Sequence, residues 1–384
     1  MAEHALLSAS GASRWMKCPP SARLEEMVEE QSSEYAKEGS FAHELAELKL
    51  SYHLGNIMKT QYNKQLKEMK RSKFYSSEME EFLQIYVDLA IEKINEARAH
   101  TKDPVVMIEM RLDYSPWVPE GFGTGDLVLV ADEVLEIVDL KFGKGIKVSA
   151  VDNPQMRLYA LGALNQYDCL YDIEKVKATI CQPRLDNIST EELEVQELLD
   201  WAEKEVRPKA ELAFKGEGAF QSGEHCVFCK VKATCRARAD ENLKLACMDF
   251  KEPPLLTDDE IVEVLMKVEE LKKWASDVEA FALATAINDG KDWPGLKLVE
   301  GRRSRKYTSE TEVAEKLLDA GYSEDMIYSK SLLSLTKLEK SLGKKAFEEI
   351  IGDLIESPPG KLKLVPVDDK RPAVRSSAEI DFKN

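Results

Sequence analysis

The chain has 384 residues, of which 43% are apolar and 32% are charged, and its formal net charge is −17. This composition indicates a globular protein that is long enough for two domains, and it excludes a mainly disordered chain. Because proteins that coat nucleic acids passively are basic, the acidic charge counts against DNA binding as the sole function, and less against DNA chemistry at a local site.

No apolar run approaches the ~20 residues that a membrane helix needs, so we expect no membrane-spanning segment and no membrane partner. The first residues lack the basic start and apolar stretch of a secretory signal peptide, which favours a cytoplasmic protein. In that reducing compartment, clustered cysteines are expected to bind a metal rather than to form disulfides.

Helix-like and strand-like patterns alternate along the first part of the chain. Helices are expected where apolar residues recur every three or four positions, and strands where short runs are rich in β-branched residues. In chain order these are helices at 34–50 and 76–100, the latter with a serine N-cap, strands at 104–113, 123–130 and 134–141, a helix from Pro154 to Gln166, a strand at 176–182 and a helix at 190–215. This order predicts an α/β fold in which helices flank a mixed sheet.

A domain boundary is expected near the Pro-rich stretch 251–257, which divides the chain into domains 1–250 and 251–384. The second domain is expected to be a mainly helical α+β accessory region. Its predicted elements are helices at 257–289 and up to about residue 356, and a strand around 295–300.

The strongest chemical signal is the pair of strands at 123–130 and 134–141. If Asp132 and Glu133 form a two-residue turn, Val128 lies opposite Ile137 and Asp126 lies opposite Asp139. Directly opposed residues have Cβ atoms roughly 4.5–5.5 Å apart on one face of the sheet. The side chain of Lys141 shares that face, because it follows Asp139 by two residues.

Two opposed carboxylates repel each other, and a divalent cation between them resolves the repulsion. Carboxylate oxygens are the ligands that hard ions such as Mg²⁺ prefer, and a bound ion polarises a phosphate and activates water. The alternative is a surface hairpin in which an aspartate and the lysine merely pair, but the apolar positions around them indicate a central hairpin.

These residues resemble motifs of the PD-(D/E)XK nuclease superfamily. The run GTGD ends at Asp126, and VDLK contains Asp139 and Lys141 at the spacing of motifs II and III. The predicted α-β-β-β-α-β order is also that of the restriction-endonuclease-like core of this superfamily. The chain is most similar to the RecB-type and CRISPR-associated exonuclease branch, which adds a histidine in an early helix and a Gln-x-x-x-Tyr motif.

That resemblance implies a role for each matching residue. His43 in SFAHELAE, together with Asp126 and Asp139, is implied to bind Mg²⁺ or Mn²⁺. Lys141 is implied to be the catalytic lysine, and Gln155 and Tyr159 in QMRLY to position the DNA or this lysine. On their own the histidine and the Gln/Tyr pair are weak signals, and Glu109 on the first strand is a further acidic group with no reason to rank beside them.

Three cysteines, Cys226, Cys229 and Cys235, form the pattern C-x2-C-x5-C, and Cys18 is the best candidate for a fourth ligand. Four thiolates suit either an iron–sulfur cluster or a tetrahedral Zn²⁺, and spacing does not separate them. The resemblance to the RecB-like branch implies a 4Fe-4S cluster. In the alternative, Cys18 is a buried thiol and His225 completes a zinc site.

The opening LSASGASRWMKCPPSAR and the layout of the chain also resemble nucleases encoded by phages and prophages beside single-strand annealing proteins. This resemblance implies a DNA exonuclease that resects duplex ends for recombination, with DNA and a phage single-strand annealing protein as its partners. Two other functions stay open: a DNA-end-binding or docking module on a nuclease fold with weak or no catalysis, and a zinc-stapled interaction protein.

Overall fold

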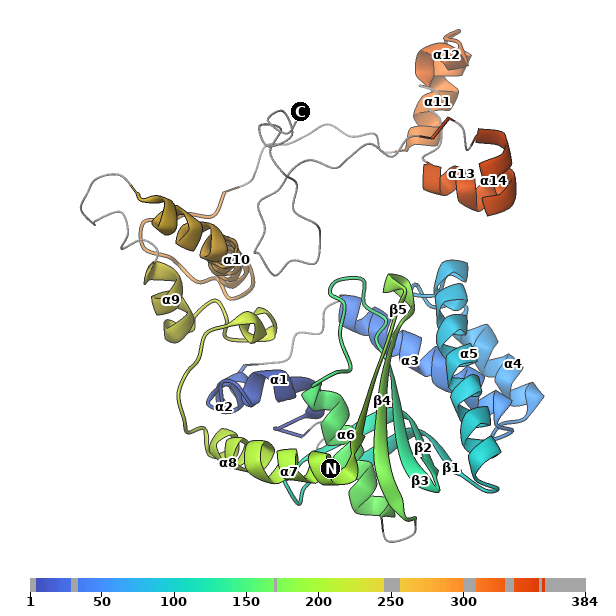
Figure 1. Cartoon of the computed structure of the whole chain (residues 1–384). Coiled ribbons are helices and arrows are strands. Elements are labelled where there is room, and N and C mark those ends of the chain that lie inside the picture. The colour runs from blue at the N-terminus through green and yellow to red at the C-terminus, as the bar shows by residue number, and fades with distance from the viewer. Residues whose placement is uncertain are drawn as a thin grey trace, which may run out of the picture. The chain divides into compact units, whose positions relative to one another are not determined.

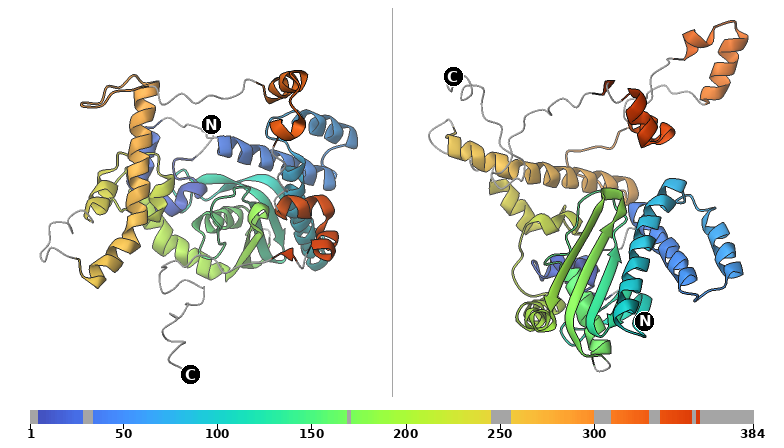
Figure 2. Two further views of the ribbon diagram at one scale, coloured as in Figure 1. Left: turned by 90° about the horizontal axis from the view of Figure 1, so that it is seen from above. Right: turned by 45° about the vertical axis from the view of Figure 1, so that its right-hand side comes forward.

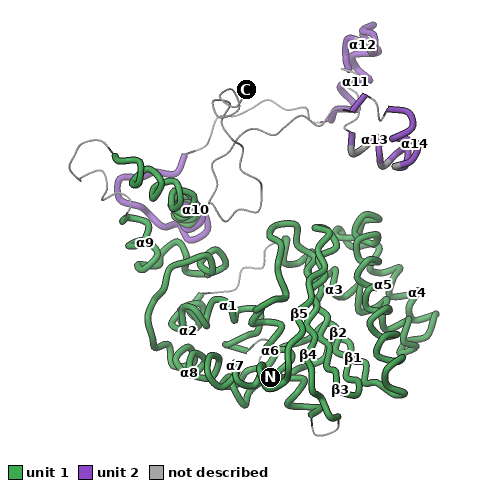
Figure 3. The backbone as a smooth tube through the Cα atoms, in the orientation of Figure 1, with its two compact units in different colours: residues 1–282 green, residues 283–384 purple. Residues whose placement is uncertain are grey.

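The computed structural model describes residues 5–28, 34–168, 171–244, 256–299, 309–328, 335–351 and 354–355. The chain divides into two compact units, residues 1–282 and 283–384, coloured separately in Figure 3. The boundary near 251–257 that the sequence favours stays a prediction.

The first unit is built on one five-stranded mixed sheet, as the sequence predicts for an α/β fold (Figure 1). Its strands follow the chain in the order β1-β2-β3-β4-β5, with β3 and β4 parallel and the other neighbours antiparallel. Their bounds are Val105–Asp113 for β1, Phe122–Ala131 for β2, Glu133–Leu140 for β3, Ile173–Gln182 for β4 and Asn187–Glu194 for β5.

The hairpin between β2 and β3 has the register that the sequence predicts. Val128 pairs with Ile137 and Val130 with Leu135, and the chain reverses at Asp132 and Glu133. The two-residue turn fixes this register. Both strands are apolar on both faces, and a slip by one residue would exchange the side chains that pack on the helices of one face with those that pack on the helices of the other.

The last predicted helix is wrong at its start, because residues 187–194 form β5. The helix begins only with α7 (Val195–Trp201) and continues through a π-helical turn, η3 (Ala202–Val206), into α8 (Arg207–Lys215). The sequence NISTEELE contains good helix formers, but pairing with β4 along the whole strand overrides that preference.

One face of the sheet is covered by α6 (Pro154–Tyr167), and the other by α3 (Glu34–His53) and α5 (Ser77–His100). Figure 2 shows the sheet between these layers. The Asn153 side chain caps α6 and the Ser76 side chain caps α5, so both predicted helix starts are confirmed. A further helix, α4 (Lys59–Met69), packs on α3.

The remaining helices of the described chain are short, apart from α10. They are η1 (Ala9–Gly11), α1 (Ala12–Trp15), α2 (Ser21–Glu26), η2 (Pro183–Leu185), η4 (Glu224–Phe228), α9 (Arg236–Leu243), α10 (Asp258–Asn288), α11 (Glu310–Asp319), α12 (Glu324–Ile327), α13 (Leu335–Leu342) and α14 (Lys344–Ile351).

The strand expected around 295–300 is wrong for residues 295–299, which have no strand structure, and residue 300 lies outside the described residues. Gly295 has a φ of 82°, which places a turn at this point instead. Among the helices that the structure describes, none is both long and apolar enough to cross a bilayer.

Candidate functional site

The aspartates and the lysine of the hairpin lie at one end of β2 and β3. The last recorded pair of the two strands is Leu127 with Val138, and Asp126 and Asp139 are the residues directly beyond it. Both carboxylates are buried, with exposed fractions of 8% for Asp126 and 3% for Asp139. Two acidic groups are therefore held out of water at the same end of the sheet, which is unfavourable without a compensating charge.

His43 reaches this end of the sheet from α3. Its Nδ1 lies 3.1 Å from Asp126 Oδ1, and Asp126 Oδ2 accepts a 2.6 Å hydrogen bond from the backbone N–H of Leu140. Burial alone lowers the pKa of His43, but the hydrogen bond to Asp126 and the negative charges nearby raise this pKa to about 9. The imidazole is therefore protonated at neutral pH unless a cation replaces its proton.

Glu109, which the sequence did not single out as a ligand, is the third member of this cluster. Its φ is 50°, in the left-handed region that is costly for a residue with a Cβ and that recurs at functional sites. One ligand atom from each of His43, Glu109 and Asp126 lies within 4.8 Å of the other two. These three side chains form a donor set that can hold one divalent cation.

Burial and the negative charge of Asp126 raise the pKa of Glu109 to about 7. A signal for Glu109 was present in the sequence, because it is the one carboxylate within the apolar run PVVMIEM of the first strand. A charged residue in a half-buried strand is rare unless it has a partner.

Lys141, Asp139, Gln155 and Tyr159 form a connected chain of polar contacts. Lys141 Nζ lies 2.9 Å from Asp139 Oδ2 and donates a 2.9 Å hydrogen bond to Gln155 Oε1. Gln155 Nε2 donates to Asp139 Oδ1 at 3.4 Å and to the Tyr159 hydroxyl at 3.2 Å. Gln155 and Tyr159 share one face of α6, because they are four residues apart. The structure therefore brings these four predicted site residues together.

Asp139 is not one of the three residues whose ligand atoms lie within 4.8 Å of one another. Burial raises the pKa of Asp139, while the ammonium group of Lys141 opposes that shift. Its assignment as a metal ligand stays a prediction.

Two buried oxygen atoms at this site have no hydrogen-bond partner among the described residues. The Tyr86 hydroxyl is one, and it lines a small cavity with His43, Glu109 and Asp126. Asp139 Oδ2 is the other, although Lys141 is close enough to form an ion pair. A buried oxygen without a partner costs free energy unless an ion or a water molecule supplies the contact. The donor atoms of His43, Glu109 and Asp126 therefore fit a single divalent cation bound directly by the side chains.

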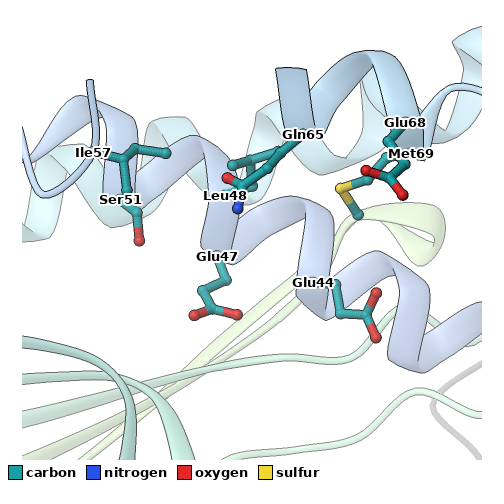
Figure 4. A pocket seen from close by; sticks show the side chains of 8 residues that line it. All are labelled: Glu44, Glu47, Leu48, Ser51, Ile57, Gln65, Glu68 and Met69. Carbon is teal, nitrogen blue, oxygen red and sulfur yellow. The ribbon is translucent and has the colours of Figure 1, made fainter. Parts of the chain in front are cut away.

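A separate pocket of about 320 Å³ lies between α3 and α4 (Figure 4). Glu47, one helical turn after His43, lines both this pocket and the small cavity beside Asp126. The pocket residues, several of them acidic, are Glu44, Glu47, Leu48, Ser51, Ile57, Gln65, Glu68 and Met69. Their negative charge disfavours a phosphate in this pocket.

The four cysteines singled out in the sequence line one small cavity in the first unit. Cys18 comes from the turn between α1 and α2, Cys226 and Cys229 from η4 and the residue after it, and Cys235 from the N-cap of α9. His225 lines the same cavity, with its Nε2 2.9 Å from the carbonyl oxygen of Gln221.

The cysteine sulfur atoms are not in contact as a set. Among the described residues, no three of these sulfurs lie within 4.8 Å of one another. Four thiolates at about 2.3 Å from a tetrahedral zinc ion would be only about 3.8 Å apart, so at least one pair among any three of these sulfurs would have to move closer to bind zinc. Burial raises the pKa of the Cys229 thiol to about 12, so its deprotonation depends on a bound cation.

Hydrogen bonds join the N-terminal helices α1 and α2 to the chain segments on the other side of the cysteine cavity. The carboxylate of Glu25 accepts hydrogen bonds of 2.8 Å from Arg14 Nε and from the backbone N–H of Lys230. Arg23 Nε donates a 2.7 Å hydrogen bond to the carbonyl oxygen of Phe214. The N-terminal helices are therefore held against the end of the sheet domain.

Comparison with known proteins gives one family match, which covers residues 4–372 and carries the description "Protein of unknown function (DUF2800)". Among solved structures, the chain is similar to one titled "Crystal structure of SSO0001", at 13% sequence identity. The similarity covers 59% of this chain and 96% of that chain, with a TM-score of 0.24, which is too low to support an argument from shape.

Proposed function

The chain belongs to the DUF2800 family, and we propose that this member is a metal-dependent deoxyribonuclease that removes nucleotides from the ends of duplex DNA. The observation that carries the proposal is the convergence of two groups of side chains at one end of the sheet. One group is His43, Glu109 and Asp126, and the other is Asp139, Lys141 and Gln155.

The order of elements supports the proposal. The helix α5 is followed by β1, β2 and β3, then by α6 and β4, which is the order expected for a PD-(D/E)XK core. The acidic and basic groups lie where β2 and β3 meet α6, the position that this core implies for its catalytic residues.

His43, Glu109, Asp126 and Asp139 are the residues that would hold Mg²⁺ or Mn²⁺. A nitrogen donor among carboxylates favours Mn²⁺ over Mg²⁺. The bound ion would neutralise phosphate charge and lower the pKa of a water molecule. The chain's own contribution is to hold two buried carboxylates in place, Asp126 through Leu140 N–H and Asp139 through Lys141 and Gln155.

Lys141 is held in position by Asp139 on one side and by Gln155 on the other. Its ammonium group can bind a non-bridging phosphate oxygen or orient the attacking water. In the hydrolysis, the water oxygen forms a bond to phosphorus and gives up a proton to the solvent. The bond from phosphorus to the leaving sugar oxygen breaks, and that oxygen takes up a proton from the solvent. Tyr159 holds Gln155 through its hydroxyl.

We further propose that the cysteine cavity binds a 4Fe-4S cluster with a structural role. The four thiols line one cavity, and four thiolates suit either a 4Fe-4S cluster or a Zn²⁺ ion. The choice of the cluster rests on the sequence resemblance, and zinc is the alternative. A phage or prophage origin, a cytoplasmic location and a single-strand annealing protein as partner belong to the same proposal and rest on the sequence resemblance.

The test is digestion of end-labelled linear duplex DNA by the purified protein, with a covalently closed circle as a second substrate. We expect cleavage of the linear DNA with Mg²⁺ or Mn²⁺, none with EDTA, and none of the circle. Asp126→Ala, Asp139→Ala and Lys141→Ala should each abolish cleavage, while the matched control Asp200→Asn, an exposed carboxylate on α7, should leave it unchanged.

Full activity in a folded Asp139→Ala variant would rule out this mechanism. Tight binding to DNA ends without cleavage, under all metal conditions, would instead favour the docking module. Cleavage of the circle would support a nuclease but would show that it is not strictly an exonuclease.

A further inference from the structure

A further cavity lies next to Lys141, at the carboxyl ends of the parallel strands β3 and β4. Its volume is about 440 Å³. The lining residues come from the start of α3, from the loop after β3 and from η2 after β4: Tyr35, Glu38, Gly39, Phe142, Gly143, Lys144, Gly145 and Arg184. We call this cavity the Arg184 groove. The carboxyl ends of parallel strands are a common position for ligand sites in α/β sheets.

The chain itself fixes how close the Arg184 groove is to the candidate catalytic residues. Phe142 follows Lys141 directly, and the backbone N–H of Lys141 donates a 2.8 Å hydrogen bond to the carbonyl oxygen of Cys181. On α3, Gly39 lies one helical turn before His43. A polymer bound at Lys141 and His43 would therefore extend its next unit into this groove.

Arg184 has a buried donor that lacks an acceptor. Its side chain is 7% exposed, its guanidinium lies 3.9 Å from the centroid of the Phe142 ring, and Nη2 lies 2.6 Å from Glu38 Oε1. Its Nε–H has no hydrogen-bond partner in the described part of the chain. An unsatisfied buried donor on a charged group is costly, and a phosphate oxygen is an acceptor that suits guanidinium.

The rest of the groove offers cationic, backbone and aromatic surface. Lys144, on the loop after β3, is exposed. An added Cβ at Gly143 or Gly145 would meet nothing within 4 Å, so the backbone there is open to a ligand. Tyr35 is 86% exposed at the mouth, and an exposed aromatic ring beside cations is the pattern of a surface on which unpaired bases stack.

We propose that the Arg184 groove binds one nucleotide of a single DNA strand beside the scissile phosphate, with Arg184 and Lys144 on its phosphate and Tyr35 stacked on its base. This inference rests on the proposed nuclease function and adds where the strand runs. A single strand fits better than a duplex, because the face of a paired base is covered by its neighbours in the stack and is not available to Tyr35. In a chain with a net charge of −17, this loop supplies the local positive charge that DNA binding needs.

The experiment measures binding of a fluorescent single-stranded oligonucleotide to the full chain in EDTA, where no cleavage occurs, at several salt concentrations. Arg184→Gln should weaken binding about tenfold and lower the slope of log K against log salt by about 0.7, the value for one lost phosphate contact on a single strand. The matched control Arg207→Gln, an exposed arginine on α8, should change neither quantity.

Tyr35→Ala should weaken binding about fivefold or more without a change of the salt slope, while Tyr35→Phe should bind as the parent does. An oligonucleotide that lacks the base stacked on Tyr35 should bind the parent and Tyr35→Ala with equal affinity. Because Tyr35 and Lys144 are exposed, their variants test the groove even if Arg184→Gln does not fold.

The proposal for the Arg184 groove would be wrong if the folded variants Arg184→Gln, Lys144→Gln and Tyr35→Ala all bound the oligonucleotide as the parent does. It would also be wrong if inorganic phosphate competed for the groove as strongly as the oligonucleotide does. The two proposals fail separately. If these variants bind DNA as the parent does and the parent cleaves DNA, only the groove proposal is rejected. If binding depends on the groove but no metal condition gives cleavage, only the nuclease proposal is rejected.

Discussion

Glu109 combines three properties at the scale of a single residue: a left-handed backbone, a raised pKa and a place among possible metal ligands. A strained backbone persists only where its surroundings impose it. Here the strain places a carboxylate beside His43 and Asp126, at the position where a cation would offset the negative charge.

Metal binding should depend on pH through Glu109 and His43. The pKa of Glu109 is about 7 and that of His43 is about 9, and both groups must lose a proton to become ligands. Affinity for Mn²⁺ should therefore fall as the pH drops below 9, because His43 takes up a proton, and more steeply below 7, because Glu109 does as well.

Glu109→Gln should weaken Mn²⁺ binding by about tenfold or more and remove the steeper dependence below pH 7. Isothermal titration calorimetry in buffers of different ionisation enthalpy measures both the affinity and the protons released. Glu44→Gln, on the same helix as His43, is the matched control and should behave as the parent does. An unchanged proton count in Glu109→Gln would exclude this carboxylate from the metal site.

Gly123 shows how a backbone position controls a side chain of the site. A Cβ added at Gly123 would lie 2.7 Å from Cε1 of Tyr159, which is too close for two carbon atoms. The absence of a side chain in this part of GTGD therefore gives the Tyr159 ring its position, and through it the hydrogen bond to Gln155.

Gly123→Ala should displace Tyr159, slow DNA cleavage about tenfold and cost about 1–3 kcal/mol of unfolding free energy, with little effect on Mn²⁺ affinity. Kinetics and urea unfolding give the two quantities. Parent-like values of both in Gly123→Ala would show that the Tyr159 ring position does not matter.

At the scale of elements, a buried arginine ties α9 to α10. Arg238 is fully buried, lines the cysteine cavity and pairs with Glu270 at 2.7 Å and with Asp277 at 2.6 Å. Both carboxylates come from α10. Removal of this arginine would leave two partly buried carboxylates without their cation and a cavity in place of the side chain.

Arg238→Ala should lower the free energy of unfolding by about 2 kcal/mol or more, a figure reduced from that of a fully buried pair because both carboxylates are partly exposed. Arg207→Ala removes the exposed pair with Glu203 and should cost less than about 1 kcal/mol. Urea unfolding of both variants measures the difference. Equal losses would mean that the α9–α10 contact contributes little.

At the scale of the whole molecule, the cysteine cavity joins segments that are far apart in sequence, Cys18 near one end of the sheet domain and Cys235 near the other. A metal bound in this cavity would contribute its binding free energy to the folded state. Glu25 and Arg23 already make contacts across the same junction, so the fold has a second connection there.

Cys18→Ala and Cys229→Ala should each remove iron and sulfide from anaerobically prepared protein and lower its melting temperature, with activity lost only as a consequence. Cys181→Ala, a buried core thiol outside the cavity, should retain iron. Stoichiometric zinc without iron would replace the cluster by zinc at the same four residues. An unchanged melting temperature after loss of the cluster would show that the cluster does not stabilise the fold.

The sequence by itself determined the strands β1 to β4, the hairpin register and the shared end of Asp126, Asp139 and Lys141. These features depend on local rules, because the alternation of side chains and the reversal at Asp132 and Glu133 fix the register between neighbouring strands. The Gln155 and Tyr159 pair follows from helical spacing in the same way.

Tertiary structure alone decided the rest. The pairing of His43 with Asp126, the place of Glu109 in the cluster and the stacking of Arg184 on Phe142 each join segments that no local period relates. The strand β5 also formed against the helical preference of its residues, because an open edge of β4 offered hydrogen bonds along its whole length. Such contacts form only when the chain packs, since packing sets which distant side chains share a buried site.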